Sequence, residues 1–422
     1  MKILLTHISN TFNYGSAMMA IILIHGIHTS INEKVEFYIE SSTEENVNRL
    51  IASTGIDSIY AYNYPIDEQW QKLSKMGKII HLVPKVLRFK GQFDQIIRKF
   101  DACIILGGDD YSEYYGTSSL AIELSKVHYL SKKMKVILAG QTMGPFTSYR
   151  TNLVKWGLQH CKVYTRDADS YRYLHGEMEM ENVILSSDLA FCELPKQSSA
   201  IEKKRVLEQY QLIGERYITI VPSGLISSYT TATDKYLLSF MDLIKKLCNE
   251  KEKGYEKVVL LAHVFNRNIT ENDSFVIGKI MNLLDDETKK QVIVITDKIL
   301  PYEARMVLGN GLFTITGRMH AAVSTFQMQK PALSLSYSVK YAGVIGKGLG
   351  MEELIIESAN DELWTSGHFA DQILGKVEYM VSHYNELQTK IKENTKNAEL
   401  LATKQVTSIV SQLEGKSTCR KS

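Results

Sequence analysis

The sequence predicts an α/β protein with two doubly wound domains and a C-terminal helical segment. Short runs of β-branched and apolar residues alternate with helix-length segments, which is typical of parallel sheets covered on both faces. Two series of such units follow one another, which indicates two domains. After Glu352 the strands are expected to stop, and residues 370–413 are expected to form one or two long helices rich in Lys and Glu.

The predicted strands are apolar along most of their length, as strands buried on both faces are. The first series comprises KILLT at 2–6, CIIL at 103–106, KVILA at 135–139, KVYT at 162–165 and NVIL at 182–185. The second series comprises YITIV at 217–221, VVLLA at 258–262, VIVI at 292–295, LFTI at 312–315 and ALSL at 332–335.

These series predict a Rossmann-like N-terminal domain at residues 1–195 and a second Rossmann-like domain at 212–365. The polar residues 196–211 are the predicted linker. Residues 366–422 are expected to form the C-terminal helices and a basic tail, and these helices could pack back on the N-terminal domain. Ligands of open α/β sheets bind beyond the carboxyl ends of the strands. Two facing domains would therefore form a cleft, in a GT-B-like arrangement, with the acceptor expected on the N-terminal and the donor on the C-terminal side.

Composition excludes several classes of protein. The formal net charge of +2 over 422 residues makes a nucleic-acid partner unexpected. Five scattered cysteines without a CxxC pair fit reduced thiols rather than disulfides or a zinc site. The run AMMAIILIHGI (17–27) is too short to span a bilayer. We expect a cytoplasmic protein without a bound metal, with peripheral association at the inner membrane face as an option.

The segment FTITGRMHAAVSTF (313–326) is the most informative candidate site. A buried strand runs into Gly317 and then delivers Arg318 and His320 at the start of a predicted helix. A helix N-terminus favours anions, and this adds to the attraction of Arg318 for one. A site that binds an anion and moves a proton needs both side chains.

Further candidates follow other strands. Asn13 and Gly15 precede a helix expected to begin near Ser16, where backbone N–H groups could hold an anion or form a plain turn. Gly107 and Gly108 allow a tight turn and close approach of a ligand.

Three more side chains remain open to two interpretations each. Tyr115 could stack on a sugar or be a partly buried aromatic. Arg166 could meet an anion or pair with Asp167 or Asp169, and His263 could face a ligand or belong to the core.

The block RMHAAVSTFQMQKPALSLSYSVKYAGVIGKGLGME (318–352) resembles the polysaccharide pyruvyl transferases, with Arg-x-His-Ala, a proline before a strand, and Tyr-x-x-Lys. NYG, GG, GQTMGPF, RDADS and SDLAF support the resemblance by their order along residues 1–355. Ser16 stands where the family often has Asp, and Asp109 where it usually has a third glycine. Both departures lie in the N-terminal half, where contacts with the acceptor are expected.

The resemblance implies transfer of pyruvate from phosphoenolpyruvate to sugar hydroxyls, as a cyclic ketal, on a bacterial cell-surface polysaccharide or its precursor, free or undecaprenyl-linked. It implies that Arg166 and Arg318 bind the donor and that His320 is the general acid. Arginine forks suit the phosphate and carboxylate of this donor. Lys340 would add donor charge and His263 would orient the acceptor. The scheme needs no cofactor besides the donor substrate.

Two alternatives stay open. A GT-B glycosyltransferase with a nucleotide-sugar donor would share the fold, but no acidic residue lies between Arg318 and Glu352 to hold a ribose. A non-catalytic family member is the other alternative, although the chain keeps both arginines and the histidine.

Overall fold

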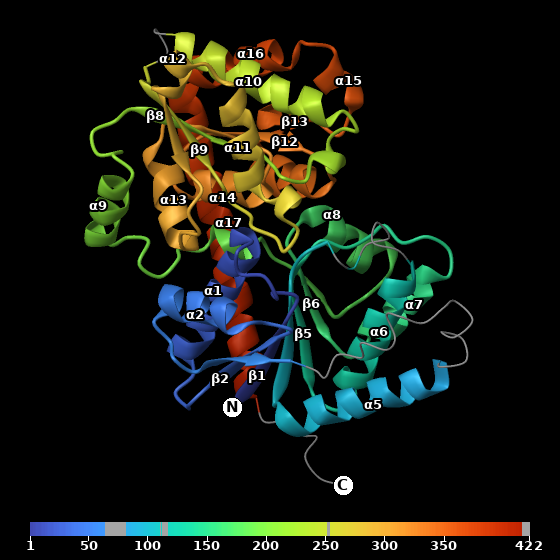
Figure 1. Cartoon of the computed structure of the whole chain (residues 1–422). Helices are drawn as coiled ribbons and strands as arrows, with labels where there is room; N and C mark the ends of the chain where they lie inside the picture. Colours follow the sequence, from blue (N-terminus) through green and yellow to red (C-terminus); the bar gives the residue numbers. More distant parts are fainter. Residues whose placement is uncertain (64–81, 110, 112–116, 251–253, 416–422) are drawn as a thin grey trace.

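The computed structural model describes residues 1–63, 82–109, 111, 117–250 and 254–415. Tyr115 lies outside these residues, so its predicted role in sugar stacking is not addressed by the structure. Within the described ranges, two α/β domains lie one above the other, each built on a parallel sheet, and a long helix runs along both (Figure 1).

The N-terminal sheet has seven strands in the order β3-β2-β1-β4-β5-β6-β7, and every pairing is parallel. Its strands are β1 (Lys2–Thr6), β2 (Glu36–Glu40), β3 (Ile59–Tyr62), β4 (Ala102–Leu106), β5 (Lys135–Gln141), β6 (Lys162–Thr165) and β7 (Val183–Leu185). The helices of this domain are α1 (Tyr14–Ser30), α2 (Glu44–Thr54), α5 (Leu82–Lys99), α6 (Thr117–Ser131), α7 (Arg150–Leu158) and α8 (Ala168–Tyr171), with short turns η2 (Arg172–Glu177) and η3 (Leu189–Phe191).

The C-terminal sheet has six parallel strands in the order β10-β9-β8-β11-β12-β13. Its strands are β8 (Tyr217–Val221), β9 (Lys257–Leu261), β10 (Val292–Ile295), β11 (Thr314–Thr316), β12 (Ala332–Ser336) and β13 (Ile355–Glu357). The helices are α10 (Thr233–Asn249), α11 (Asp273–Leu283), α12 (Asp286–Lys289), α13 (Pro301–Asn310), α14 (Met319–Gln327) and α15 (Asp361–Thr365), with short turns η4 (Ile226–Ser228), η5 (Ile269–Glu271), η6 (Ala342–Lys347) and η7 (Glu352–Leu354).

All ten predicted strands are present, which confirms the predicted α/β class with two parallel sheets. The expectation that strands stop after Glu352 is wrong, because β13 follows at Ile355–Glu357 and pairs with β12 at the sheet edge. Two further strands, β2 and β3, were not expected. All three lie at or next to a sheet edge and have apolar runs of only two to four residues.

Residues 196–211 contain the helix α9 (Ala200–Gln209), which packs against α13. The chain around this crossing is held by Arg305 of α13, a fully buried side chain. Arg305 donates hydrogen bonds to the carbonyls of Ala190 and Cys192 and to the side chain of Gln197. Burial lowers the pKa of Arg305 to about 9. The crossing between the domains is therefore fixed by a buried guanidinium group.

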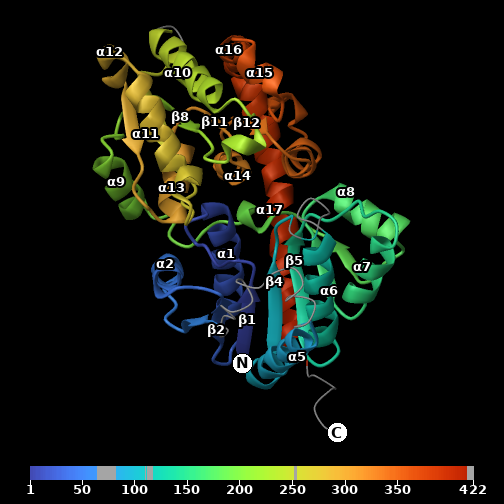
Figure 2. The same ribbon diagram turned by 45° about the vertical axis from the view of Figure 1, so that its right-hand side comes forward.

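The C-terminal segment forms two helices, as expected for residues 370–413: α16 (Phe369–Ser382) and α17 (Tyr384–Glu414). In both views α17 runs from the C-terminal domain down along the N-terminal one (Figures 1 and 2). Near its start, the Tyr384 hydroxyl donates to the carbonyl of Leu312 at 2.9 Å. Further on, the Ser408 and Tyr164 hydroxyls lie 2.7 Å apart. This helix therefore binds both domains and limits how far they can separate.

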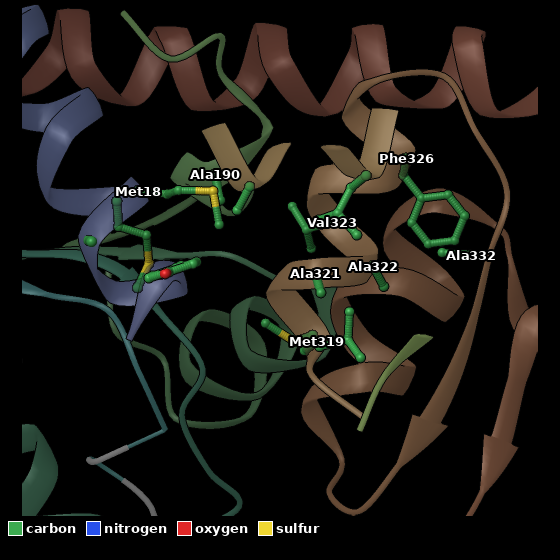
Figure 3. Close-up of a cluster of buried hydrophobic side chains, with 14 of the residues drawn as sticks. Met18, Ala190, Met319, Ala321, Ala322, Val323, Phe326 and Ala332 are labelled. Atoms are coloured by element: carbon green, nitrogen blue, oxygen red, sulfur yellow. The ribbon is translucent and has the colours of Figure 1, made fainter. Parts of the chain in front are cut away.

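The helix α14 follows the segment that sequence analysis singles out. Its apolar residues Ala321, Ala322, Val323 and Phe326 are buried, and Figure 3 shows them along one helix close to Ala332 of β12. Burial of this face fixes α14 against the sheet. The first turn of α14, with Arg318 just before it, is thereby held rigidly at the carboxyl end of β11.

Candidate functional site

A cavity of about 270 Å³ lies in the cleft, where the carboxyl ends of strands from both sheets meet. Its walls come from the loops after β1, β4 and β6 in one domain and after β8, β9, β11 and β12 in the other. The lining residues are His7, Asn13, Ser16, Met19, Gly107, Gly108, Asp109, Arg166, Leu225, His263, Val264, Arg318, Met319, His320, Tyr337 and Lys340.

Most of the predicted site residues line this one cavity. The structure brings together Arg166, Arg318, His320, Lys340, His263, Asn13, Gly107 and Gly108. Gly107 lies so close to the neighbouring loop that an added Cβ would be 1.8 Å from the carbonyl oxygen of Gly140. Gly15 does not line the cavity, but it contacts the ring of His320. The roles of these residues stay predictions.

Two tyrosines hold the turn between β11 and α14 in place. Tyr229 and Tyr341 both donate hydrogen bonds from their hydroxyls to the carbonyl of Gly317. Burial raises the pKa of each phenol well above its usual value, so both remain donors. Arg318 is the N-cap residue of α14, which agrees with the helix start predicted at this point. The turn therefore presents Arg318 and His320 in a fixed orientation.

Arg166 and His320 share one carboxylate, that of Asp188. Arg166 Nη1 lies 2.9 Å from Asp188 Oδ2, and His320 Nε2 lies 3.3 Å from the same oxygen. Burial alone would raise the pKa of Asp188. The charges of His320 and Arg166, together with hydrogen bonds from His320 and the Ala190 amide, instead hold this pKa well below its usual range. Asp188 is therefore ionised, and it joins an arginine of the N-terminal domain to the histidine of the other domain.

This pairing differs from the ion pair considered for Arg166 in the sequence. The partner is Asp188, not Asp167 or Asp169. Asp167 instead caps α8 by accepting from the Ser170 amide at 2.7 Å. Arg166 also donates from Nε to Thr142 Oγ1 at 2.8 Å, which leaves Nη2 without a hydrogen bond to any described residue. Nη2 is therefore the part of Arg166 that a ligand could use.

Arg318 is bound to Asp273, a fully buried residue at the first turn of α11. Its Nε and Nη2 atoms lie 3.1 and 2.6 Å from Asp273 Oδ1. Burial would lower the pKa of Arg318, but the Asp273 carboxylate and its hydrogen bonds raise it instead. The Nε–Nη2 edge is thus taken, so a donor anion can approach Arg318 only through its remaining N–H groups.

Lys340 reaches the cavity from the loop after β12. Its Nζ lies 3.0 Å from the Tyr337 hydroxyl and 3.6 Å from Asp109 Oδ2, across the cleft. Asp109 stands where the resembling family usually has glycine. Lysine and aspartate therefore meet between the two domains at the edge of the cavity.

His263 is almost fully buried, and its Nε2 has no hydrogen-bond partner among the described residues. Burial lowers the pKa of His263 well below its usual 6.5, and the nearby charges of His320, Arg318 and Arg305 lower it further. The ring is therefore neutral at physiological pH. An unpartnered, neutral imidazole nitrogen at the cavity can donate or accept one hydrogen bond from a ligand.

The neutral state of His263 predicts a pH-dependent stability. Below about pH 6.5 the unfolded chain protonates this imidazole and the folded chain does not, so the unfolded state binds more protons and stability falls as pH falls. At about pH 5.5 the expected loss is about 1.4 kcal/mol. We expect His263→Phe to lack this loss, as measured by urea unfolding at about pH 7.5 and about pH 5.5. His160→Phe, at an exposed ring, serves as the control; equal pH dependence in all three proteins would contradict the prediction.

Gly15 lies in the first turn of α1, which begins at Tyr14, two residues before the expected start near Ser16. A Cβ on Gly15 would be 2.2 Å from His320 Nδ1 and 2.5 Å from His320 Cγ. These atoms belong to the ring itself and cannot bend away as a flexible chain end could. A glycine is required here because the imidazole packs on the backbone of α1.

We expect Gly15→Ala to displace the His320 ring and to reduce turnover about 10²-fold while the protein stays folded. The matched control is Gly278→Ala in α11, where an added Cβ meets nothing within 4 Å. That change should leave turnover unaltered and slightly increase stability. Initial rates of phosphate release, with circular dichroism to verify folding, test the pair. Normal turnover in Gly15→Ala would contradict the close packing.

Three functional candidates are absent from the predicted site. His7 follows β1 directly and lines the cavity, so the rule of looking beyond strand ends could have found it. Its Nε2 lies 3.7 Å from Glu123 Oε2, and its ring stacks on Tyr111. Asp188 lies in the SDLAF motif, but the motif by itself does not indicate a role for this carboxylate. Asp273 has no sequence signal, because only folding brings it to Arg318.

The charges of the site balance closely. Asp188, Asp273 and Asp109 face Arg166, Arg318, Lys340 and, when protonated, His320. A protonated His320 leaves an excess of positive charge, which favours a small anionic ligand. Among the described residues, no group of three His, Cys, Asp or Glu side chains could hold a metal ion. The arrangement can bind an anion and deliver a proton to it.

No helix in the described part of the chain is both long and apolar enough to cross a membrane. The fold resembles that of several solved structures. UDP-GlcNAc 2-epimerase from Neisseria meningitidis matches with a TM-score of 0.60 and 14% identity over 98% of this chain and 100% of that chain. Lps heptosyltransferase II from E. coli matches with a TM-score of 0.50 and 13% identity over 91% and 100%. At these identities the likeness shows the GT-B-like fold alone.

Comparison of sequences is more specific. The amylovoran biosynthesis protein AmsJ from Erwinia amylovora is 23% identical over 330 residues, which cover 76% of this chain and 74% of that protein. A model of the polysaccharide pyruvyl transferase family matches residues 13–339. Since this match spans well over half of the 422 residues, the chain belongs to the polysaccharide pyruvyl transferase family.

Proposed function

We propose that the protein transfers pyruvate from phosphoenolpyruvate to two hydroxyls of a saccharide acceptor in the biosynthesis of a bacterial surface polysaccharide. The observation that supports this most is the single cavity that Arg166, Arg318, Lys340 and His320 line together. Phosphoenolpyruvate has a phosphate and a carboxylate on one carbon, so cations from both domains suit its two anionic groups. Membership of the family points to the same donor.

In the proposed reaction, His320 donates a proton to the methylene carbon of phosphoenolpyruvate. The C2 carbon becomes oxocarbenium-like, an acceptor hydroxyl forms the first C–O bond, and the C–O bond to phosphate breaks. A second hydroxyl then closes the ketal. The first hydroxyl gives its proton to His320 and so restores the proton that entered the new methyl group. The proton of the second hydroxyl leaves with inorganic phosphate.

Asp188 would orient the His320 ring, because its carboxylate lies 3.3 Å from Nε2. Arg166 and Arg318 would bind the donor through the N–H groups that Asp188 and Asp273 leave available. His263, neutral and with Nε2 unpartnered among the described residues, would orient the acceptor hydroxyl.

The proposal is tested by thermal unfolding of the whole chain with phosphoenolpyruvate and, separately, with UDP-N-acetylglucosamine. Phosphoenolpyruvate should raise the unfolding temperature, since a ligand that binds only the folded state stabilises it. Stabilisation by the nucleotide sugar alone would favour a glycosyltransferase, and stabilisation by neither would favour a non-catalytic protein. Mass spectrometry of saccharides after incubation with phosphoenolpyruvate would then identify the pyruvylated product.

A further inference from the structure

The cleft contains a second, larger cavity of about 940 Å³ on the other side of the loop after β1. Its walls come from the loops after β1, β2 and β3 of the N-terminal domain and after β9 and β10 of the C-terminal domain. Asparagine side chains predominate in its lining: Asn10, Asn46, Asn63, Asn266 and Asn272. We call this cavity the asparagine groove. It shares no lining residue with the catalytic cavity.

A short interdomain bridge separates the two cavities. The Phe265 amide donates to the carbonyl of Phe12 at 3.1 Å, and the Tyr14 amide donates to the carbonyl of His263 at 3.3 Å. Side chains alternate along such paired segments. Accordingly, Asn13 between them lines the catalytic cavity, whereas Phe12 and Phe265 line the asparagine groove. A ligand in the groove would therefore lie within a few residues of the proposed site of pyruvyl transfer.

Hydrogen bonds among its own residues hold the walls of the groove in place. Asn10 Nδ2 donates to the carbonyl of Phe265 at 2.9 Å, across the two domains. The Thr11 amide donates to Asn46 Oδ1 at 2.7 Å, and this joins the loop after β1 to α2. The groove is thus preformed, which lowers the entropy that a ligand loses on binding.

Two polar atoms of the groove, from Ser42 and Asn63, make no hydrogen bond within the described residues. Ser42 is 3% exposed, yet its Oγ makes no hydrogen bond to any described residue. A buried hydroxyl without a partner destabilises the folded protein. Its neighbour Asn63 uses Nδ2 to bind the Ser42 carbonyl at 2.9 Å, and its Oδ1 has no hydrogen bond within the described residues. These groups are where a ligand with hydroxyls would bind.

The chemistry of the lining indicates an uncharged ligand rich in hydroxyls. Amides and hydroxyls both donate and accept hydrogen bonds, as sugar hydroxyls do. Charged groups are few: Glu45 and Lys298 form an ion pair with each other at 3.7 Å, and Arg267 is exposed. The catalytic cavity, at about 270 Å³, is too small for a donor together with an oligosaccharide, since pockets for drug-sized ligands take about 300–1,000 Å³.

We propose that the asparagine groove binds the sugar residues of the acceptor that neighbour the reacting one. This inference rests on the proposed function, because it assigns a second subsite to the same acceptor. The enzyme would then recognise an oligosaccharide rather than a single sugar. Binding energy from sugars that do not react would hold the reacting sugar at the donor.

The test uses saturation-transfer NMR on the whole chain. The ligands are four tetrasaccharides, each built from one sugar (glucose, galactose, mannose or N-acetylglucosamine), and each is compared with its own monosaccharide. At least one tetrasaccharide should bind more tightly than its monosaccharide. Ser42→Ala should weaken that binding about two- to tenfold. The same variant should unfold at a higher temperature without ligand, because the unpartnered hydroxyl is gone. A purely structural serine would not give opposite effects on stability and binding.

A bulky side chain in the groove should exclude the ligand. Ser9→Trp, at an exposed position in the groove, should abolish tetrasaccharide binding, whereas Ser125→Trp, at an exposed position on α6, should not. Unchanged binding in Ser9→Trp, or no tetrasaccharide binding to the parent protein, overturns the inference. Stabilisation by phosphoenolpyruvate is measured in parallel. If tetrasaccharides bind in the groove but phosphoenolpyruvate does not stabilise the protein, the proposed function is refuted and the groove remains a binding site. If phosphoenolpyruvate stabilises the protein but no tetrasaccharide binds in the groove, only the groove proposal is refuted.

Discussion

Replacing His320 by glutamine is expected to reduce pyruvyl transfer by about 10²–10⁴-fold, the usual contribution of a general acid. Glutamine has a similar length and can still bind Asp188, but it has no titratable proton for the methylene carbon. Phosphoenolpyruvate should continue to raise the unfolding temperature, because the cations of Arg166, Arg318 and Lys340 remain. Phosphate release with acceptor present measures the transfer step, and thermal unfolding measures donor binding.

The matched control is His160→Gln, at an exposed histidine outside the cavity, and it should leave both readings unchanged. Loss of donor binding together with activity in His320→Gln would instead assign His320 to binding. Full activity in that variant would remove His320 from the mechanism, whatever its position in the cavity.

Replacing Asp188 by asparagine is expected to affect stability as well as activity. The carboxylate is fully buried and accepts from both Arg166 and His320. Its loss leaves the Arg166 guanidinium buried without a counter-charge, and breaking a buried pair in this way costs about 3–5 kcal/mol. His320 also loses the carboxylate that orients its ring. Urea unfolding and initial rates, measured on the same preparation, give the two effects.

The control is Asp169→Asn. Asp169 also pairs with a cation of the other domain, Lys347, at 2.7 Å, but the Lys347 and Asp169 side chains are 54% and 40% exposed. Exposed pairs contribute about 0–1 kcal/mol, so this variant should remain close to the parent protein. Equal stability of the two variants would mean that the Asp188 network does not hold the domains at the site.

Much of the fold is encoded locally. The central strands are continuous apolar runs, such as KILLT at Lys2–Thr6 and YITIV at Tyr217–Val221, because both faces of a parallel sheet are covered. Strands at the sheet edges lack this signal. Glutamates stand at both ends of β2 and leave only three apolar residues between them, and β13 has only three residues, so neither could be told from a loop.

The sequence by itself determined the two parallel sheets and the strand–turn–helix that presents Arg318 and His320, because hydrophobic periodicity and a glycine turn are local properties of the chain. It could not show which carboxylate meets which cation. Asp188 and Asp273 lie 132 and 45 residues away from the groups they bind, His320 and Arg318. Packing of the two domains brings Asp188 and Gly15 to His320, whereas folding of the C-terminal domain brings Asp273 to Arg318. Ion pairs and close contacts depend on distance in space, which only the tertiary structure decides.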